Sequence, residues 1–239
     1  MSVRRLATVV AALDERENLE LLVPRLAATL RALAGFEAEM IFVVAGTDGS
    51  AGYLEALGGT TVIRQTDRGG LAEAFRAGFA AVDRGADVVV TMDADLNHRP
   101  EELPRLLAAL DGSGADIVVG SRGVPGAVIE SASWIKRAAS RIGNAVIGVL
   151  FGDRIRDRTS GYRVYRRPRL DELPVAGAGF SFLPAMLLAA ERAGMVIVEE
   201  PISFDRRRWG HSKLPIVATT LGYLRLALQA RNLGRRRRR

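Results

Sequence analysis

Short apolar runs of strand type alternate with amphipathic helices through the first half of this 239-residue chain. Between residues 17 and 33, for example, Leu19, Leu22, Val23 and Leu26 recur at helical spacing. Alternation of this kind predicts an α/β fold with a mostly parallel sheet and helices on both of its faces. The predicted strands cover 6–13, 39–44, 61–64, 87–92, 116–120 and 196–204, and the predicted helices cover 17–33, 71–82, 100–110 and 133–150.

The regular alternation ends after Gly120. A loop containing Gly and Pro is expected over 122–131, and a charged loop over 153–163. No linker separates the two halves, so we predict one domain over 1–213, in which the second half forms the side that binds a second substrate, the acceptor. Residues 214–239 are expected to add an amphipathic helix and an arginine-rich tail.

The apolar run Val88–Met92 ends in two carboxylates, Asp93 and Asp95. Alternate residues of an extended chain point the same way, so both can converge beyond the carboxyl end of the strand, where parallel sheets bind ligands. A hard divalent ion, Mg²⁺ or Mn²⁺, suits two such oxygen ligands and leaves positions open for phosphates. A lone Asp-x-Asp is more often a solvated loop that caps the next helix. The buried strand and the motifs downstream favour the metal site.

The amino-acid composition limits the kinds of binding partner that are expected. The chain has no cysteine, which excludes disulfides, thiolate metal sites and a cysteine nucleophile. Aromatic residues make up 6% and do not interleave with basic ones, so nucleic acid is not expected as a partner. Five of the positive charges are Arg235–Arg239, behind an apolar stretch that begins at Leu214. This pairing predicts contact with an anionic membrane surface, while a core-packing helix with a solvated basic end stays open.

The amino terminus runs directly into a predicted strand, without the apolar core of a signal peptide. No apolar segment approaches the ~20 residues that span a bilayer. The expected location is therefore the cytoplasm, with peripheral attachment to the inner face of the membrane left open. The sequence does not indicate an oligomeric state.

Several short motifs follow one another in a recognisable order. They are Glu15–Leu19, Met92–His98, Gly120–Arg122, Lys136–Arg137 with Ser140, Arg141 and Asn144, Asp157–Arg163, Glu200–Phe204 and Gly210–Lys213. This ordered set resembles the inverting nucleotide-sugar glycosyltransferases, and most closely their dolichyl/polyprenyl-phosphate mannosyltransferase branch. The resemblance implies a single Rossmann-like GT-A domain.

The resemblance also implies roles for individual residues. Asp93, Asp95 and Asn97 would hold Mg²⁺ or Mn²⁺ on the donor's diphosphate. Arg122, Lys136 and Ser140 would receive the acceptor's phosphate, and Arg207 and Lys213 would close over the donor and neutralise the leaving nucleoside diphosphate. Glu15 and Arg163 are further substrate-binding candidates. Arg206 and Arg208 flank Arg207, and the sequence does not decide which of the three points inward.

An acceptor phosphate removes the need for a general base, because a phosphate monoester is already ionised near neutral pH. Asp157 is the nearest candidate base, but it could equally order its own loop. His98 is expected to cap or bridge locally rather than to transfer a proton.

Two loops depart from the family pattern. Residues 11–15 read Ala-Ala-Leu-Asp-Glu where the family has Pro-Thr-Tyr-Asn-Glu, and residues 45–50 read Ala-Gly-Thr-Asp-Gly-Ser where it has Asp-Asp-Gly-Ser-x-Asp. In the family these loops bind the nucleoside, so Asp14 and Asp48 are predicted to substitute for the lost carboxylates. Ala185 stands where the family usually has a glutamate.

The sequence thus predicts metal-dependent transfer of a sugar from a nucleoside-diphosphate sugar, with a GDP-sugar favoured, to polyprenyl phosphate. The alternative is a metal-dependent mutase, isomerase or transferase that acts on a nucleotide sugar without a lipid acceptor. A non-catalytic subunit or membrane-binding module is a third hypothesis, and the intact metal and arginine motifs argue against it.

Overall fold

The computed structural model describes residues 3–65, 70–130, 155–173, 181–207 and 209. The helix predicted over 133–150 lies outside the described residues, as do Lys136, Ser140, Lys213 and the predicted tail over 214–239. Within the described part of the chain, no helix has both the length and the apolar character needed to span a membrane.

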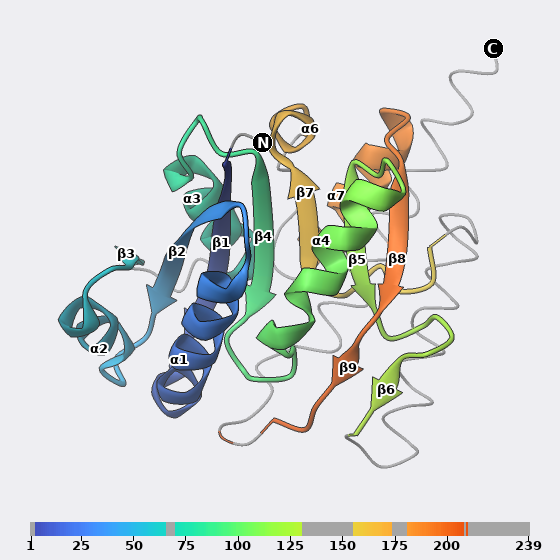
Figure 1. Ribbon diagram of the computed structural model, residues 1–239. Coiled ribbons are helices and arrows are strands. Elements are labelled where there is room, and N and C mark those ends of the chain that lie inside the picture. The colour runs from blue at the N-terminus through green and yellow to red at the C-terminus, as the bar shows by residue number, and fades with distance from the viewer. Residues whose placement is uncertain (1–2, 66–69, 131–154, 174–180, 208, 210–239) are drawn as a thin grey trace.

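A seven-stranded sheet forms the centre of the molecule, in the order β3-β2-β1-β4-β7-β5-β8 (Figure 1). Adjacent strands are parallel except around β7, which runs antiparallel to both of its neighbours. The mostly parallel sheet predicted from the sequence is therefore confirmed. The strands are β1 (Arg4–Leu13), β2 (Phe36–Ala45), β3 (Thr61–Arg64), β4 (Val88–Asp93), β5 (Ile117–Ser121), β7 (Arg163–Arg166) and β8 (Ile197–Pro201).

Helices cover both faces of the sheet, as predicted (Figure 1). Successive side chains of β4 show why, because Val90 belongs to one buried apolar cluster and Val89 to the other. On the Val90 side pack α1 (Arg16–Ala32), α2 (Ser50–Leu57) and α4 (Leu103–Gly112), the last entered through the 3-10 turn η1 (Pro100–Glu102). On the Val89 side pack α3 (Gly70–Ala81), the short α6 (Arg167–Asp171) and α7 (Phe182–Arg192).

Several elements differ from the prediction. Helices α2, α6 and α7 and the strand β7 were not expected. The strand predicted over 196–204 is interrupted at Ile202, so that β8 ends there and β9 (Ser203–Phe204) begins. β9 pairs with β6 (Val128–Ile129) in a separate two-stranded sheet, although a loop was predicted at β6.

The topology brings five chain segments to one edge of the sheet. β1, β2, β4 and β5 all point their carboxyl ends there, and the antiparallel β7 begins there. Residues that follow the first four strands, and the loop that precedes β7, therefore meet at this edge.

Candidate active site

The carboxylate pair lies at this edge, as predicted. Asp93 is the last residue of β4 and pairs in register with Ala11 of β1. Gly161 leaves room for its side chain, because a Cβ at Gly161 would lie 2.7 Å from Asp93 Oδ1. The hydroxyl of Thr91 donates to the Gly161 carbonyl over 2.7 Å, which fixes the loop before β7 against β4.

Asn97 holds the side chain of Asp95. Its side-chain Nδ2 donates to Asp95 Oδ2 over 2.7 Å, and its backbone N donates to Asp95 Oδ1 over 3.2 Å. Asn97 therefore orients one carboxylate, and its part as a third metal ligand stays a prediction. Among the residues that the structure describes, no three His, Cys, Asp or Glu side chains gather as a metal site.

Two carboxylates in this setting still fit a divalent ion. Burial raises the pKa of Asp93, against the opposing effect of Arg122, Arg163 and Arg207. Burial also raises the pKa of Asp95, and the charge of Asp93 raises it further. A cation held between them would offset both effects. An ion held by so few protein ligands keeps positions open for phosphate oxygens.

His98 lies beneath the pair. It is 1% exposed, its Nδ1 is 3.7 Å from Asp93 Oδ2, and its ring packs against those of Tyr162 and Phe204 at centroid distances of 5.3 and 5.7 Å. Burial lowers its pKa to about 4. The imidazole is therefore neutral near pH 7, which agrees with the local bridging role expected for it.

Arg122, which is partly buried, forms an ion pair with the fully buried Asp157. Arg122 Nε and Nη2 donate to the two carboxylate oxygens over 2.6 and 2.8 Å, the Arg122 backbone N donates over 3.0 Å, and the guanidinium lies over the Phe204 ring. Nη2 also donates to Thr159 Oγ1 over 2.7 Å. This fork fixes the guanidinium plane at the edge of the site.

The same pair bears on the role of Asp157. Burial by itself would raise the pKa of this fully buried carboxyl group, but the charge and hydrogen bonds of Arg122 outweigh burial and hold the pKa well below its ordinary range. A carboxylate engaged in this way is a poor general base. These contacts favour the alternative that the sequence left open, in which Asp157 orders its loop and positions Arg122, and its catalytic part stays a prediction.

Arg163 is buried and bonded within the protein. It is 0% exposed, and its guanidinium donates to the backbone carbonyls of Ser160, Arg158 and Leu183 over 2.8 to 2.9 Å. These bonds anchor the loop before β7 to α7 and give Arg163 a structural role, while its predicted contact with substrate stays a prediction.

At the ends of β1 and β2, the side chain of Asp14 lies where a side chain at Gly46 would have to lie. Asp14 has the unusual φ of 48° and its Oδ1 accepts a hydrogen bond from Thr47 N over 2.8 Å. Gly46 has a φ of 105°, and a Cβ added to it would overlap Asp14 Oδ1. The carboxylate of Asp14 thus occupies the space that a side chain at position 46 would need. This position is one where the family pattern has an aspartate.

Asp48 instead braces two helices. Its Oδ2 accepts a bond from Arg16 N over 2.8 Å, and its Oδ1 accepts one from Ser50 N over 3.0 Å. These contacts tie the first turn of α1 to that of α2. They give Asp48 a structural role beside the predicted contact with the nucleoside, which stays a prediction.

We expect Gly46→Ala to destabilise the protein by about 1–3 kcal/mol, because the new methyl group must displace Asp14 and alanine disfavours a positive φ. Adding Asp14→Gly removes the carboxylate, so the double variant should lose less stability than the two single variants together. Denaturant unfolding of the four proteins measures this coupling. Strict additivity would contradict the shared space.

Arg207 is the late arginine that points inward. Its Nη2 contacts Glu15 Oε1 and lies 4.0 Å from Asp95 Oδ2. Its neighbour Arg206 is exposed. The choice that the sequence left open between them is thereby resolved for Arg206 and Arg207, while Arg208 lies outside the described residues.

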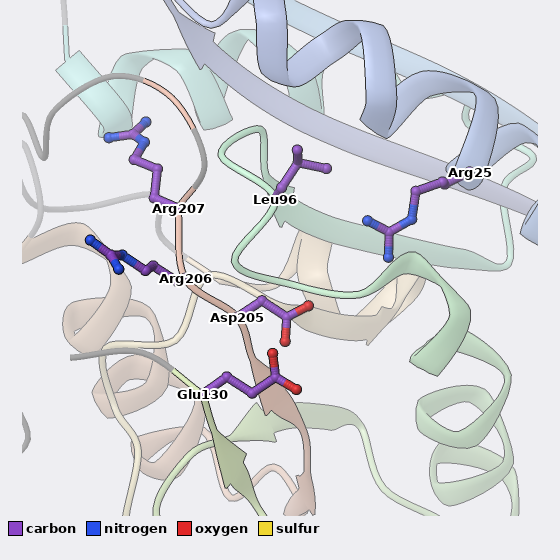
Figure 2. Close-up of a pocket in the computed structure, with 6 residues that line it drawn as sticks. All are labelled: Arg25, Leu96, Glu130, Asp205, Arg206 and Arg207. Atoms are coloured by element: carbon purple, nitrogen blue, oxygen red, sulfur yellow. The ribbon is translucent and has the colours of Figure 1, made fainter.

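A cavity of about 460 Å³ adjoins this arginine (Figure 2). Figure 2 shows Arg206 and Arg207 extending to one side of the segment after β9, whereas the Asp205 carboxylate points to the other. Two of the lining residues, Asp205 and Glu130, are acidic. Arg99 offsets their charge by donating to Asp205 over 2.6 Å and to Glu130 over 2.8 Å. The lining residues are Arg25, Leu96, Glu130, Asp205, Arg206 and Arg207.

Comparison with known proteins identifies the family. The model of the family described as Glycosyl transferase family 2 matches residues 8–173, which is more than half of the chain. The chain belongs to glycosyl transferase family 2. It is therefore a glycosyltransferase, and the resemblance stated from the sequence is confirmed.

Relatives within glycosyl transferase family 2 include polyprenol monophosphomannose synthase of Mycolicibacterium smegmatis, 34% identical, with 88% of this chain and 81% of the relative covered. The undecaprenyl-phosphate mannosyltransferase of Micrococcus luteus is also 34% identical and covers 88% of this chain and 87% of its own length. The dolichol-phosphate mannosyltransferase of Pyrococcus furiosus is 32% identical over 88% of this chain, which spans 59% of that protein.

Solved structures confirm the GT-A fold predicted for this family member. Glucosyl-3-phosphoglycerate synthase from Mycobacterium tuberculosis, in complex with Mn²⁺, UDP and phosphoglyceric acid, superposes with a TM-score of 0.74. The two are 20% identical, and the match covers 95% of this chain and 78% of that one. The likeness is one of fold.

Three contributors to the site were not assigned from the sequence. Asn18 and Gly161 stand inside motifs that the resemblance used, but neither was given a role. Glu199 was not singled out, and its carboxylate accepts bonds from Ser121 Oγ and Asp157 N over 2.6 and 2.8 Å. No local pattern marks Glu199, because its partners come from two distant loops.

Proposed function

We propose that this glycosyltransferase moves a sugar from a nucleoside-diphosphate sugar to polyprenyl phosphate. One observation carries the proposal. The partly buried carboxylates Asp93 and Asp95 have two arginines as charged neighbours: Nη2 of Arg207 lies 4.0 Å from Asp95 Oδ2, and the charges of Arg122 and Arg207 both act on Asp93. The site therefore offers a place for a metal-bound diphosphate and a place for a second phosphate.

On the donor side, Asp93 and Asp95 would hold Mg²⁺ or Mn²⁺. Bound there, the ion supplies Lewis-acid stabilisation of the charge that develops on the diphosphate. Arg207 adds a second positive group that becomes more effective as that charge grows. Mycobacterial relatives in fold were solved with Mn²⁺ or Mg²⁺ and UDP, which supports a divalent ion in this class of site.

The nucleoside would meet Asp14 and Asp48 at the ends of β1 and β2. Guanine presents an exocyclic amino group that a carboxylate can accept. The carboxylate of Asp14, displaced into the space above Gly46, is a suitable acceptor. This chemistry supports the GDP-sugar favoured from the sequence.

On the acceptor side, Arg122 would pair with the phosphate of the lipid, together with Lys136 and Ser140. The positive charge of the Arg122 guanidinium would attract the phosphate, and the bonds from Nε and Nη2 to Asp157 fix the plane of the group. A phosphate monoester needs no general base, and the role found for Asp157 is consistent with that. Three relatives named for polyprenol, undecaprenyl phosphate or dolichol phosphate support this acceptor.

The predicted membrane contact of 214–239 and the peripheral, cytoplasmic location form part of the proposal. Isomerisation of a nucleotide sugar gains no support from the named relatives. One assay separates these functions. Purified protein is incubated with GDP- and UDP-sugars, with and without polyprenyl phosphate in anionic vesicles, and the products are resolved by mass and retention time.

We expect a lipid-linked sugar to form only when polyprenyl phosphate is present. Chelation of the divalent ion should lower the rate at least ~100-fold, since metal stabilisation contributes several kcal/mol, and added Mn²⁺ or Mg²⁺ should restore it. An isomerised donor without lipid would overturn transfer in favour of the mutase. Full transfer after chelation would overturn the metal.

A further inference from the structure

The beginning of α1 grips the segment that follows β9. Glu15 is 6% exposed, and its Oε1 contacts Arg207. Its other oxygen, Oε2, accepts a bond of 2.6 Å from Nδ2 of Asn18, which is 1% exposed. The same Nδ2 donates to the carbonyl of Trp209 over 3.4 Å. Glu15, which immediately precedes α1, and Asn18 in its first turn thus hold the segment after β9 at both Arg207 and Trp209.

We propose that Glu15 and Asn18 form a clasp that positions Arg207 beside the carboxylate pair. Glu15 is then a positioning residue for Arg207, and not the substrate contact expected from the sequence. The part of the clasp in sugar transfer rests on the proposed function. Its part in holding the segment does not, because every contact is within the protein.

The contacts of Glu15 explain why it serves the arginine and not a ligand. Both of its oxygens have protein partners, one from a charged donor and one from an amide. Burial raises the pKa of Glu15, while Arg207 and Asn18 lower it, so the ionised form depends on these two residues. A buried carboxylate of this kind forms a strong charge-assisted bond.

The hydrogen bonds of the Asn18 amide support the same interpretation. Its Oδ1 is buried and has no hydrogen-bond partner among the described residues. Leaving a buried acceptor unpaired costs free energy, and an apolar side chain at this position would avoid that cost. The two bonds from Nδ2, to Glu15 and to the Trp209 carbonyl, account for an amide here.

The surroundings of Arg207 show what the clasp controls. Arg206 is exposed and Trp209 is 40% exposed, so the segment has little packing of its own. Without Glu15, the long Arg207 side chain would sample many rotamers. Held by Glu15, the Nη2 atom of Arg207 stays 4.0 Å from Asp95. It is then within reach of a diphosphate whose metal ion is held by that carboxylate.

Ligand-free protein tests the clasp. Hydrogen exchange of the peptide covering 203–209 should accelerate about tenfold in Glu15→Gln, which loses a charge-assisted bond. Iodide quenching of Trp209 should increase, measured in a Trp134→Phe background because Trp134 is the other tryptophan of the chain. Asn18→Ala should act in the same direction. Glu17→Gln makes the same charge change at an exposed residue of the same helical turn and is the matched control.

A double variant distinguishes positioning from general loosening of α1. On an Arg207→Ala background, Glu15→Gln should add less than about twofold to the exchange rate, because its partner is already gone. Equal acceleration on both backgrounds would overturn the clasp, and so would wild-type exchange in Glu15→Gln. Unchanged exchange at the α1 peptides shows that the helix itself stays folded.

Measurements of sugar transfer distinguish a failure of the proposed function from a failure of the Glu15–Asn18 clasp. Glu15→Gln should lower kcat for transfer about tenfold and leave KM for the lipid unchanged, since Arg207 acts on the donor's leaving group. If the wild-type protein transfers no sugar, the proposed function fails while the exchange results still judge the clasp. If transfer occurs and Glu15→Gln keeps its full kcat, the clasp fails and the proposed function stands.

Discussion

Replacing Asp95 by alanine is expected to lower the rate of sugar transfer about a thousandfold. The variant keeps Asp93 but loses the second of two carboxylates available to the metal, and metal stabilisation of a developing charge contributes several kcal/mol. Steady-state transfer in saturating Mn²⁺ measures the rate, and calorimetric titration measures Mn²⁺ binding, which should weaken in parallel.

This loss should not come from unfolding. Burial and the charge of Asp93 raise the pKa of Asp95, so its ionised form costs more free energy in the folded protein than in the unfolded chain. Its removal relieves repulsion, and the unfolding temperature of metal-free Asp95→Ala should not fall. Asp171→Asn, which changes a carboxylate 59% exposed on the surface, provides the control. Full activity in Asp95→Ala would contradict the metal assignment.

Replacing Asp157 by asparagine is expected to destabilise the protein by about 3–5 kcal/mol, the usual effect of breaking a buried ion pair. Asparagine keeps the shape but cannot accept both donors of the Arg122 fork as a charged group. Denaturant unfolding measures the loss. Sugar transfer should fall as well, because the Arg122 guanidinium loses the partner that fixes its plane.

The loss should depend on pH in a definite direction. Arg122 holds the pKa of Asp157 well below its value in the unfolded chain, which is about 4. The stabilisation is therefore complete above that unfolded value and disappears as pH falls through the lower, folded value. Wild type and Asp157→Asn should converge in stability as the solution is made strongly acidic. A constant difference, or a surface-like loss under ~1 kcal/mol, would contradict this account.

The sheet and the edge that carries the site could be predicted from the sequence. Apolar runs such as Val88–Met92 have the period and length of buried parallel strands, and parallel topology places their carboxyl ends together. Asp93 and Asp95 were located by this rule, and the structure places them at that edge.

β7 could not be predicted, and its residues show why. Only Val164 and Tyr165 of its four residues are apolar, and they enter opposite cores. At its ends, Arg163 and Arg166 are paired with backbone carbonyls from distant parts of the chain. A short strand flanked by arginines reads as a charged loop until those partners are known. α2 was missed for a related reason, since Leu54 is its only apolar residue in the buried core.

Roles within the site depended on contacts between distant residues. Sequence alone could not show that Arg163 bonds to the Leu183 carbonyl, 20 residues away, or that Asp157 is saturated by Arg122. It likewise could not show that Asp14 fills the space above Gly46. The resemblance identified which residues matter, and three-dimensional contacts decide what each of them does.

The antiparallel insertion of β7 has an evolutionary consequence. Because β7 returns beside β5, the chain between Arg122 and Asp157 leaves and re-enters the sheet at one place, closed by their ion pair and by the bond from Gly120 N to the Tyr162 carbonyl. Both ends of this excursion are fixed independently of what lies between them. A change in the length of this excursion can therefore be accommodated in evolution without a change in the order of the strands.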